Sequence, residues 1–307
     1  MTRTESTAST VEIRSMTFGS TRPAVHFGLG RIALYALLIV LALLFLMPVY
    51  VMAVNSMKPL DEIRNGNLLA LPMDWSFAPW ATAWSTAQIG VEPTGLKPYF
   101  INSFLMVLPA VAISTLLGAL NGYILTQFRF QGAHLLFAAM LCSVFIPFQI
   151  VLIPMAKTLG LLGLAGTVKG LVLVHVIYGI GFSALFFRNY YAAFPVELIR
   201  SARMDGAGFF GVLLRILLPN SAPIIVVCVI WQFTNIWNDF LFGASFSDFS
   251  SFPLTVALNN LVNSSTGVKE YNVHFAGAFI AALPTLLVYL ISGKYFVRGL
   301  MAGSVKG

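Results

Sequence analysis

The sequence has few charged residues: Asp, Glu, Lys and Arg together make up 9% of its 307 residues, against about a quarter in ordinary globular proteins. Hydrophobic residues make up 58%, and the mean hydropathy is +0.85. This composition excludes an ordinary soluble domain and indicates an integral membrane protein. The net charge of +7 does not indicate nucleic-acid binding, because the arginines border apolar segments and form no basic cluster interleaved with aromatic residues.

Cysteine pairs and enzyme motifs are also missing. Cys142 and Cys228 lie singly inside apolar runs, which indicates packing residues. The chain has no H-E-x-x-H, no G-x-S-x-G and no close pair of intramembrane carboxylates. The segment Ser292-Gly293-Lys294-Tyr295 lacks the upstream glycine and the following Ser or Thr of a phosphate-binding loop. We therefore expect no catalytic residue, no metal site and no ATP bound by this chain.

Long apolar segments dominate what is present. Six of them have about the 20 residues that a membrane-crossing helix needs, and they comprise residues 32–54, 101–125, 134–155, 168–187, 219–243 and 275–297. The first is longer than the apolar part of a signal peptide and no small-residue cleavage site follows it, so we expect a retained anchor. Residues 1–28 are expected to form a flexible cytoplasmic tail. The sequence thus predicts an all-α membrane protein with a six-helix domain at 29–307.

The basic residues predict the orientation of this domain. With a cytoplasmic amino terminus, twelve of the 18 Lys and Arg residues fall in inner segments. The other six are Lys58, Arg64, Lys97, Lys157, Lys169 and Lys269. The positive-inside rule then places both termini in the cytoplasm. The polar segment 194–219, between the fourth and fifth spans, lies on the same side.

This polar segment contains RSARMDGAGFFGVLLRILLP, residues 200–219. Pro195 predicts a helix start, and residues 196–204 then predict a short helix. Gly206 and Gly208 permit left-handed backbone conformations that end it, and a second helix is expected to enter the membrane at Pro219. Asp205 is expected to cap the following backbone amides. An amphipathic helix lying in the lipid headgroups is the alternative, which explains the arginines but not the glycines.

The same residues resemble the signature of the inner-membrane permease subunits of ATP-binding-cassette (ABC) importers, which reads E-A-A, three residues, G, nine residues, I-x-L-P. Here Arg200-Ser201-Ala202 is followed by three residues, Gly206, nine residues and Ile216-Leu217-Leu218-Pro219. The spacing matches throughout. Arg200 and Ser201 replace the usual Glu and Ala, and the nearby Glu197 can partly substitute.

The resemblance extends from about residue 29 to the carboxyl terminus and indicates one branch of this permease family. Phe128-Arg129-Phe130, Ile146-Pro147-Phe148-Gln149 with Ile153-Pro154, Leu159-Gly160-Leu161 and Trp237-Asn238-Asp239-Phe240-Leu241 are similar to carbohydrate-uptake permeases, in particular to the second permease of maltose-type importers. The later segments TVALNNLVNSSTGVKEYNV and GKYFVRGLMAGSVKG look most like permeases of glucose or mannose importers.

This resemblance implies a multi-subunit importer in a bacterial inner membrane. A related second permease, two nucleotide-binding ATPase subunits that hold ATP and Mg²⁺, and a periplasmic sugar-binding protein are the implied partners. The residues assigned to the ATPase contact are Glu197, Arg200, Ser201, Ala202, Arg203, Asp205, Gly206, Ala207 and Pro219. Arg200 and Arg203 are expected either to pair with acidic groups of the ATPase or to contact lipid headgroups.

Candidate pathway residues lie in the third, fourth and fifth spans. Gln232, Asn235 and Asp239 are spaced to share one helix face, with Trp237 and Asn238 beside it. Amide and carboxylate groups suit sugar hydroxyls and an aromatic ring covers the apolar side of a sugar. Hydrogen bonds to neighbouring helices are the alternative.

Prolines and glycines mark the third and fourth spans. Pro147 and Pro154 loosen the third span, and Gly179 and Gly181 allow bending or close approach in the fourth. The polar residues of these two spans that can face the freed backbone or the pathway are Gln149 and Tyr178.

Two other classes of function stay open at this point. A sodium- or proton-driven carrier needs ionisable residues at mid-membrane, and His175 by itself indicates helix packing. A channel or scaffold that only recruits a cytoplasmic partner is the remaining possibility.

Overall fold

A computed structural model describes residues 29–128, 130–263 and 269–302, with side chains described up to residue 293. The tail expected at 1–28 lies outside the described residues, as do Arg129 and parts of the two later segments that carry the branch resemblance. The described residues are mostly helical and contain no strand. The chain divides into two compact units, Met1–Pro48 and Val49–Gly307. The described part of the first unit is the apolar beginning of α1.

Four helices are long and apolar enough to cross a membrane: α1 (Leu29–Asn55), α4 (Lys97–Gln127), α7 (Val168–Ala192) and α14 (Tyr271–Ala302). Two further candidates are bent pairs. One joins α5 (Ala133–Phe145) to α6 (Phe148–Leu161) at 103°, and the other joins Phe209–Asn220 to α11 (Ala222–Trp237) at 80°. The described chain therefore has four candidate spans, or up to six if each bent pair is one span. The third and fifth expected spans are thus not straight helices.

The break between α5 and α6 follows from Pro147. A proline lacks the backbone N–H and drives the preceding residue out of the α conformation. Ile146 is accordingly extended, with φ −67° and ψ 123°, and Pro147 itself caps α6. Pro154 lies inside α6 without ending it. The expected loosening of this span is confirmed at Pro147.

The fifth span does not begin at Pro219 as expected. Phe209–Val212 (α9) leads into a π-helix at Leu213–Leu217 and a last turn at Leu218–Asn220 (α10), and α11 starts only at Ala222. Pro219 and Pro223 both lack the N–H that would continue a regular helix through this point. The Tyr190 hydroxyl donates to the Asn220 carbonyl across 2.7 Å, which satisfies a carbonyl released at the bend. The straight helix α11 is therefore shorter than the predicted span, and it also ends before Asp239.

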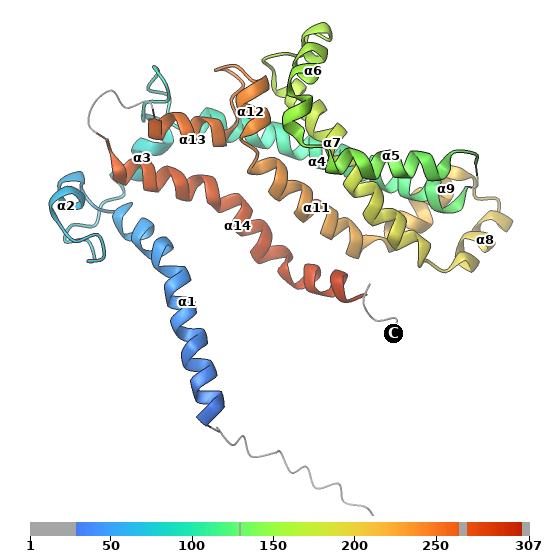
Figure 1. The fold of residues 1–307 in the computed structure, drawn as a ribbon, viewed down its shortest axis with the longest axis horizontal. Coiled ribbons are helices and arrows are strands. Elements are labelled where there is room, and N and C mark those ends of the chain that lie inside the picture. Colours follow the sequence, from blue (N-terminus) through green and yellow to red (C-terminus); the bar gives the residue numbers. More distant parts are fainter. Residues whose placement is uncertain (1–28, 129, 264–268, 303–307) are drawn as a thin grey trace, which may run out of the picture. The chain divides into compact units, whose positions relative to one another are not determined.

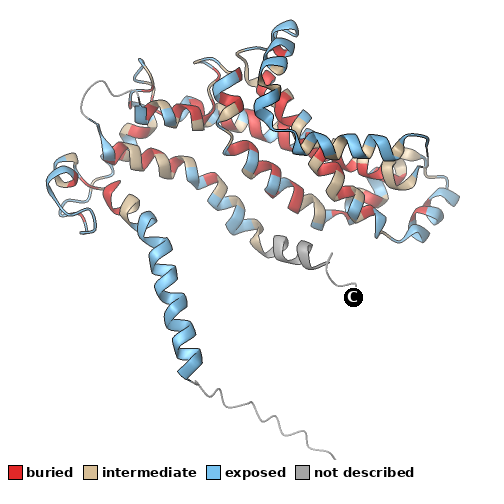
Figure 2. Ribbon diagram, in the orientation of Figure 1, coloured by how far each residue is buried: buried red, intermediate tan, exposed pale blue. Residues whose placement is uncertain are grey.

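Close packing of α4 against α7 forms the centre of the second unit (Figure 1). Glycines on α4 make this possible: a Cβ at Gly122 would lie 2.6 Å from the Phe187 Cβ, and one at Gly118 would overlap Ser183. Small residues of this kind let membrane helices approach closely. Figure 2 shows buried residues along α7 and α11, whereas α5 has none.

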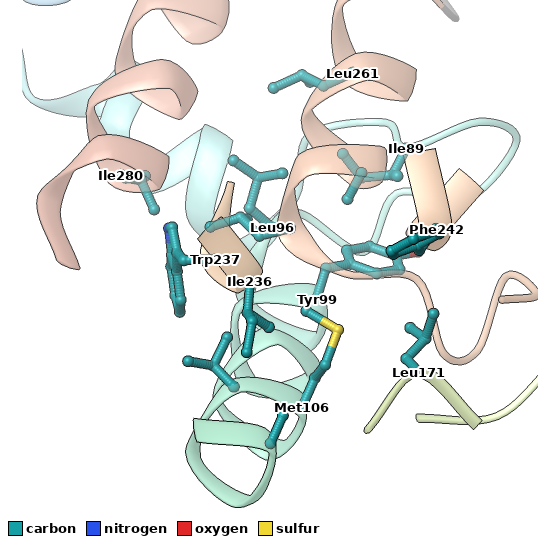
Figure 3. Packing of buried hydrophobic residues seen from close by; sticks show 14 of the residues in the cluster. Ile89, Leu96, Tyr99, Met106, Leu171, Ile236, Trp237, Phe242, Leu261 and Ile280 are labelled. Atoms are coloured by element: carbon teal, nitrogen blue, oxygen red, sulfur yellow. The ribbon is translucent and has the colours of Figure 1, made fainter. Parts of the chain in front are cut away.

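The buried residues form two clusters. The first packs the α4 residues Tyr99 and Met106 against Ile236 and Trp237 of α11 and Ile280 of α14 (Figure 3). It includes residues from the two connections that carry short helices, α2 (Leu60–Asn65) with α3 (Ala78–Ser85), and α12 (Leu241–Phe246) with α13 (Leu254–Asn263). The second cluster lies at the other end of α4 and α7 and includes residues of the segment 194–219. Each end of the helix pair therefore has its own core.

Candidate functional site

A pocket of about 270 Å³ lies where α7, α11 and the α5–α6 break meet. We call it the Asp239 pocket. Its polar lining residues are His175, Tyr178, Gln232, Asn235 and Asp239, and its aromatic ones are Phe148, Phe182, Trp231 and Phe242. Polar groups among aromatic side chains are the composition of small-molecule sites.

Gln232 is buried on the floor of the Asp239 pocket. Its Nε2 donates to the Gly179 carbonyl across 2.8 Å and to the Ser183 hydroxyl across 3.0 Å, both on α7, and lies 3.3 Å from the Ser114 hydroxyl on α4. This residue therefore makes the helix-to-helix hydrogen bonds that the sequence left as the alternative, and it also lines the pocket. It fixes the position of the floor.

Asp239 follows the end of α11 and joins three parts of the chain. Its carboxylate accepts from the backbone N–H groups of Phe242, at 3.3 Å, and Gly243, at 3.1 Å, and so caps the start of α12. Its backbone carbonyl accepts from the Thr255 hydroxyl across 2.6 Å. On the pocket side, its Oδ2 lies 3.7 Å from Nε2 of His175, which has no hydrogen-bond partner among the described residues. The carboxylate is thus the charged group that lines the pocket here, and the imidazole nitrogen beside it is buried.

An aromatic wall faces these polar groups. The rings of Phe182 and Trp231 stack with their centroids 4.5 Å apart and their planes 13° apart. Trp231 is 45% exposed, so one ring of the stack remains open. Phe242 contacts the rings of both Tyr178 and His175, at 5.1 and 5.6 Å. Polar groups opposite an open aromatic face suit a sugar, which has hydroxyl edges and an apolar side.

The structure brings together Tyr178, Gln232, Asn235 and Asp239, four of the seven predicted pathway residues. The remaining three lie elsewhere. Gln149 and Asn238 are exposed outside the pocket, and Trp237 is buried in the first core cluster.

The placement of Trp237 corrects the prediction, because its ring is not beside the polar face. It is 1% exposed, stacks on Phe233, and donates from Nε1 to the Ala281 carbonyl of α14 across 2.9 Å. The aromatic residue beside Asn235 is Trp231, which the sequence reasoning missed. The signal was present, since residues four apart share a helix face.

The second region is the coupling segment, residues 194–219. Its short helix, α8 (Val196–Met204), has the bounds that the sequence predicted. Ile199 and Ala202 are buried, whereas Leu198 and Met204 are 49% and 82% exposed. One face of α8 is thus anchored, and two of its apolar residues remain exposed.

Gly206 ends α8 as expected, with φ +87°. The Ala207 N–H donates to the Ala202 carbonyl across 2.9 Å and the Gly206 N–H to the Arg203 carbonyl across 3.1 Å, which is the Schellman arrangement of a helix end. Gly208 does not share the left-handed conformation, because its φ is −73°. Within the described chain the Asp205 side chain does not cap the amides that follow; Asp205 occupies the carboxyl-terminal cap of α8 itself. These two expectations were wrong. Gly208 is not left-handed because the Schellman turn needs only one left-handed residue. Asp205 does not cap the next helix because it ends α8, and Gly208 is the residue that precedes α9.

The polar side chains of α8 point outward. Glu197, Arg200 and Ser201 are exposed, and the Ser201 hydroxyl bonds only to the Leu198 carbonyl of its own helix. The Arg203 guanidinium lies 5.6 Å above the Phe128 ring at the end of α4. α8 therefore presents mixed apolar and charged groups to the outside.

Buried contacts tie the coupling segment to the long helices. Ile199, Val212 and Leu217 are at most 1% exposed and pack with Tyr123 of α4 and Phe187 of α7 in the second core cluster. Pro219 is exposed and takes no part in this cluster. The attachment is thus lateral packing and not the straight helix continuation that the sequence suggested.

Several helices long and apolar enough to cross a membrane indicate a multi-pass membrane protein. The chain belongs to the family of binding-protein-dependent transport system inner membrane components, whose profile matches residues 99–300, more than half of its length. It is a permease of an ABC sugar importer, a non-catalytic subunit of the inner membrane. The carrier and channel alternatives are therefore set aside.

Two relatives and one solved structure show the extent of the likeness. A probable ABC transporter permease of Pyrococcus horikoshii is 42% identical over 58% of this chain and 65% of that protein, so the match spans just under two thirds of that relative. An arabinooligosaccharides transport system permease of Bacillus subtilis is 30% identical over 93% of this chain and 99% of that protein. A crystal structure of a bacterial ABC transporter involved in the import of the acidic polysaccharide alginate covers 86% of this chain and 95% of its own, with a TM-score of 0.75 and 20% identity. That likeness shows a shared fold.

Proposed function

We propose that the Asp239 pocket lies on the sugar pathway and that the coupling segment transmits ATPase closure to it. The observation that carries the proposal is the pairing in one pocket of Asn235 and Asp239 with the open Trp231 ring. Hydroxyl groups of a sugar can donate to the Asp239 carboxylate and exchange hydrogen bonds with the Asn235 amide, while the indole covers an apolar sugar face. Gln149, Trp237 and Asn238 have no part in this version of the pathway.

The coupling proposal rests on how α8 is held. A helix can convert movement of a partner into movement of the spans only if it is fixed to them, and Ile199 provides that fixed contact. Its exposed residues include Leu198, Met204 and the charged Arg200, and this mixture suits a groove on an ATPase subunit. In this account ATP and Mg²⁺ are bound by the two ATPase partners, and Arg203 is partly engaged by Phe128.

We propose six spans with both termini in the cytoplasm. Each bent pair then counts as one span, and the uneven distribution of Lys and Arg supports this orientation. The partners are a related permease, the ATPases and an extracytoplasmic sugar-binding protein, as the name of the family suggests for the last of these.

The proposed substrate is a monosaccharide of the glucose or mannose type. A volume of about 270 Å³ is just below the ~300–1,000 Å³ typical of small-molecule pockets, which suits one sugar ring better than a chain of them. The Bacillus subtilis relative is named for arabinooligosaccharides, so the size of the sugar needs a direct test.

The test is uptake by the complete importer in vesicles, with the matching binding protein and ATP. Glucose, mannose and a series of their oligosaccharides are offered at equal concentration. The proposal expects saturable, ATP-dependent uptake of a single sugar ring. Preference for oligosaccharides would contradict the substrate class but not the pathway, and equal uptake without ATP would contradict the importer mechanism.

A further inference from the structure

A second pocket, of about 370 Å³, lies where α4 ends, α5 begins and α7 ends. We call it the Arg188 pocket. Its lining includes Thr126, Phe128, Phe130, His134, Phe137 and Arg188. It is separate from the Asp239 pocket, since the two share no lining residue.

The cation of this pocket is held in place but unpaired. The Arg188 guanidinium lies over the Phe137 ring, 4.0 Å from its centroid. Stacking uses the flat face of the guanidinium, so its N–H donors, which lie in the plane, remain available. Within the described part of the chain, no ion pair or side-chain hydrogen bond engages it.

No acidic residue of the surrounding helices can neutralise Arg188. The chain has no Asp or Glu between Glu92 and Glu197, so α4, α5 and α7 contain none. Glu197 and Asp205 of the coupling segment do not line the pocket. His134 adds a second nitrogen donor on the rim. The pocket thus combines hydrogen-bond donors and a positive charge, and none of its lining residues is acidic.

The position of the pocket indicates which anion meets it. Arg188 lies one turn before the end of α7, and His134 lies in the first turn of α5. The ends of apolar membrane helices coincide with the headgroup layer, and basic pockets between such helices bind anionic headgroups. Aromatic side chains around the cation suit the carbon atoms attached to a phosphate.

We propose that the Arg188 pocket binds a phosphate group, with Arg188 and His134 as its donors. The geometry favours the phosphodiester of an anionic phospholipid. A soluble phosphate compound offers the same chemistry and is the other source.

Occupancy of this pocket also bears on the coupling segment. Phe128, which lines the pocket, contacts the Phe209 ring of α9 at 5.5 Å and the Arg203 guanidinium of α8 at 5.6 Å. If α8 couples to the ATPase, which rests on the proposed function, a phosphate bound in this pocket helps to hold α8 in position through Phe128. The binding test is independent of coupling, so failure of one leaves the other standing.

The experiment titrates the complete transporter, purified in a neutral detergent, with short-chain phosphatidylglycerol and counts bound lipid by native mass spectrometry. Arg188→Gln is expected to weaken binding about tenfold, the effect of losing a hydrogen bond to a charged group. Arg215→Gln is the matched control, because Arg215 is an exposed arginine of the neighbouring segment that does not line the pocket. Its affinity should equal that of the wild type.

A competition with inorganic phosphate distinguishes the two sources. Displacement of the lipid by millimolar phosphate assigns the pocket to soluble phosphate compounds, and retention of the lipid assigns it to headgroups. Equal binding by wild type and Arg188→Gln, or an equal loss in Arg215→Gln, would overturn the proposal. If Arg188→Gln does not assemble, lipid binding is measured on His134→Ala instead, because His134 is exposed and its replacement should not disturb assembly. An unchanged lipid affinity in His134→Ala would also overturn the proposal.

Discussion

Nε2 of Gln232 donates a hydrogen bond to the carbonyl oxygen of Gly179 across 2.8 Å, which joins α11 to α7 beneath the Asp239 pocket. The two residues depend on each other sterically as well. A Cβ added to Gly179 would overlap that Nε2 and would lie 2.8 Å from the Ser114 Cβ. The amide reaches its acceptors only because residue 179 has no side chain.

Gly179→Ala is therefore expected to destabilise the protein by about 1–3 kcal/mol, the cost of forcing an extra carbon into a packed site. The measurement is the melting temperature of the purified transporter in detergent. Gly160→Ala is the control, because a Cβ there meets nothing within 4 Å. Equal melting temperatures for the two variants would show that α7 and α11 do not pack as described.

Asn235 and Asn238 offer a matched pair for the pathway. Both are exposed, and each donates from Nδ2 to the carbonyl four residues earlier across 2.8 Å. Only Asn235 lines the Asp239 pocket. Asn235→Ala should reduce sugar uptake roughly two- to tenfold, which corresponds to one hydrogen bond of about 0.5–1.5 kcal/mol, and Asn238→Ala should leave it near the wild-type rate. If Asn238→Ala reduced uptake in the same vesicles and Asn235→Ala did not, the Asp239 pocket would not be part of the pathway.

Substitutions of Trp231 and Trp237 should have different effects, one on transport and the other on stability. Trp237 is buried in the core, so Trp237→Ala is expected to cost about 3–5 kcal/mol of stability. Trp231 is half exposed on the pocket wall, so Trp231→Ala should lower sugar uptake with little change in melting temperature. Thermal unfolding and uptake are measured on both variants. Loss of stability without loss of uptake in Trp231→Ala would identify its ring as a packing group.

Local signals in the sequence predicted much of the fold. Pro195 and Gly206 bound α8 correctly because each constrains the backbone at its own position. The break at Pro147 was predicted from the proline itself. The size of that bend and the bend at Ser221 were not predicted, because hydropathy measures how apolar a segment is and contains no information on direction. Their angles depend on tertiary contacts such as the bond from the Tyr190 hydroxyl to Asn220.

The candidate site was predicted in part for a similar reason. Helical spacing grouped Gln232 and Asn235 correctly, because residues three apart share a face. Asp239 lines the same pocket although it lies just beyond the end of α11. Trp237 is two residues from Asn235, which puts it about 200° around the helix, whereas Trp231 is only about 40° away. The angular positions around the helix alone thus favoured Trp231 as the aromatic residue beside Asn235. The polar partners of Gln232 on α7 could not be read from α11, because they belong to a helix about fifty residues away in the chain.

The coupling account depends on the left-handed turn at Gly206. Any side chain there strains the turn by about 1–2 kcal/mol, and Val, which is β-branched, is among the least tolerated. Gly208 has an ordinary φ of −73° and open space around it, so Gly208→Val is a matched control. Both variants keep the buried anchors of the coupling segment.

Sugar-stimulated ATP hydrolysis by the reconstituted importer, measured together with co-purification of the ATPase subunits, tests this account most directly. Gly206→Val is expected to insert into the membrane normally but to release the ATPase or to lose sugar stimulation, while Gly208→Val retains both. Normal stimulation and normal co-purification in a well-expressed Gly206→Val variant would contradict the assignment of residues 194–219 as the coupling element.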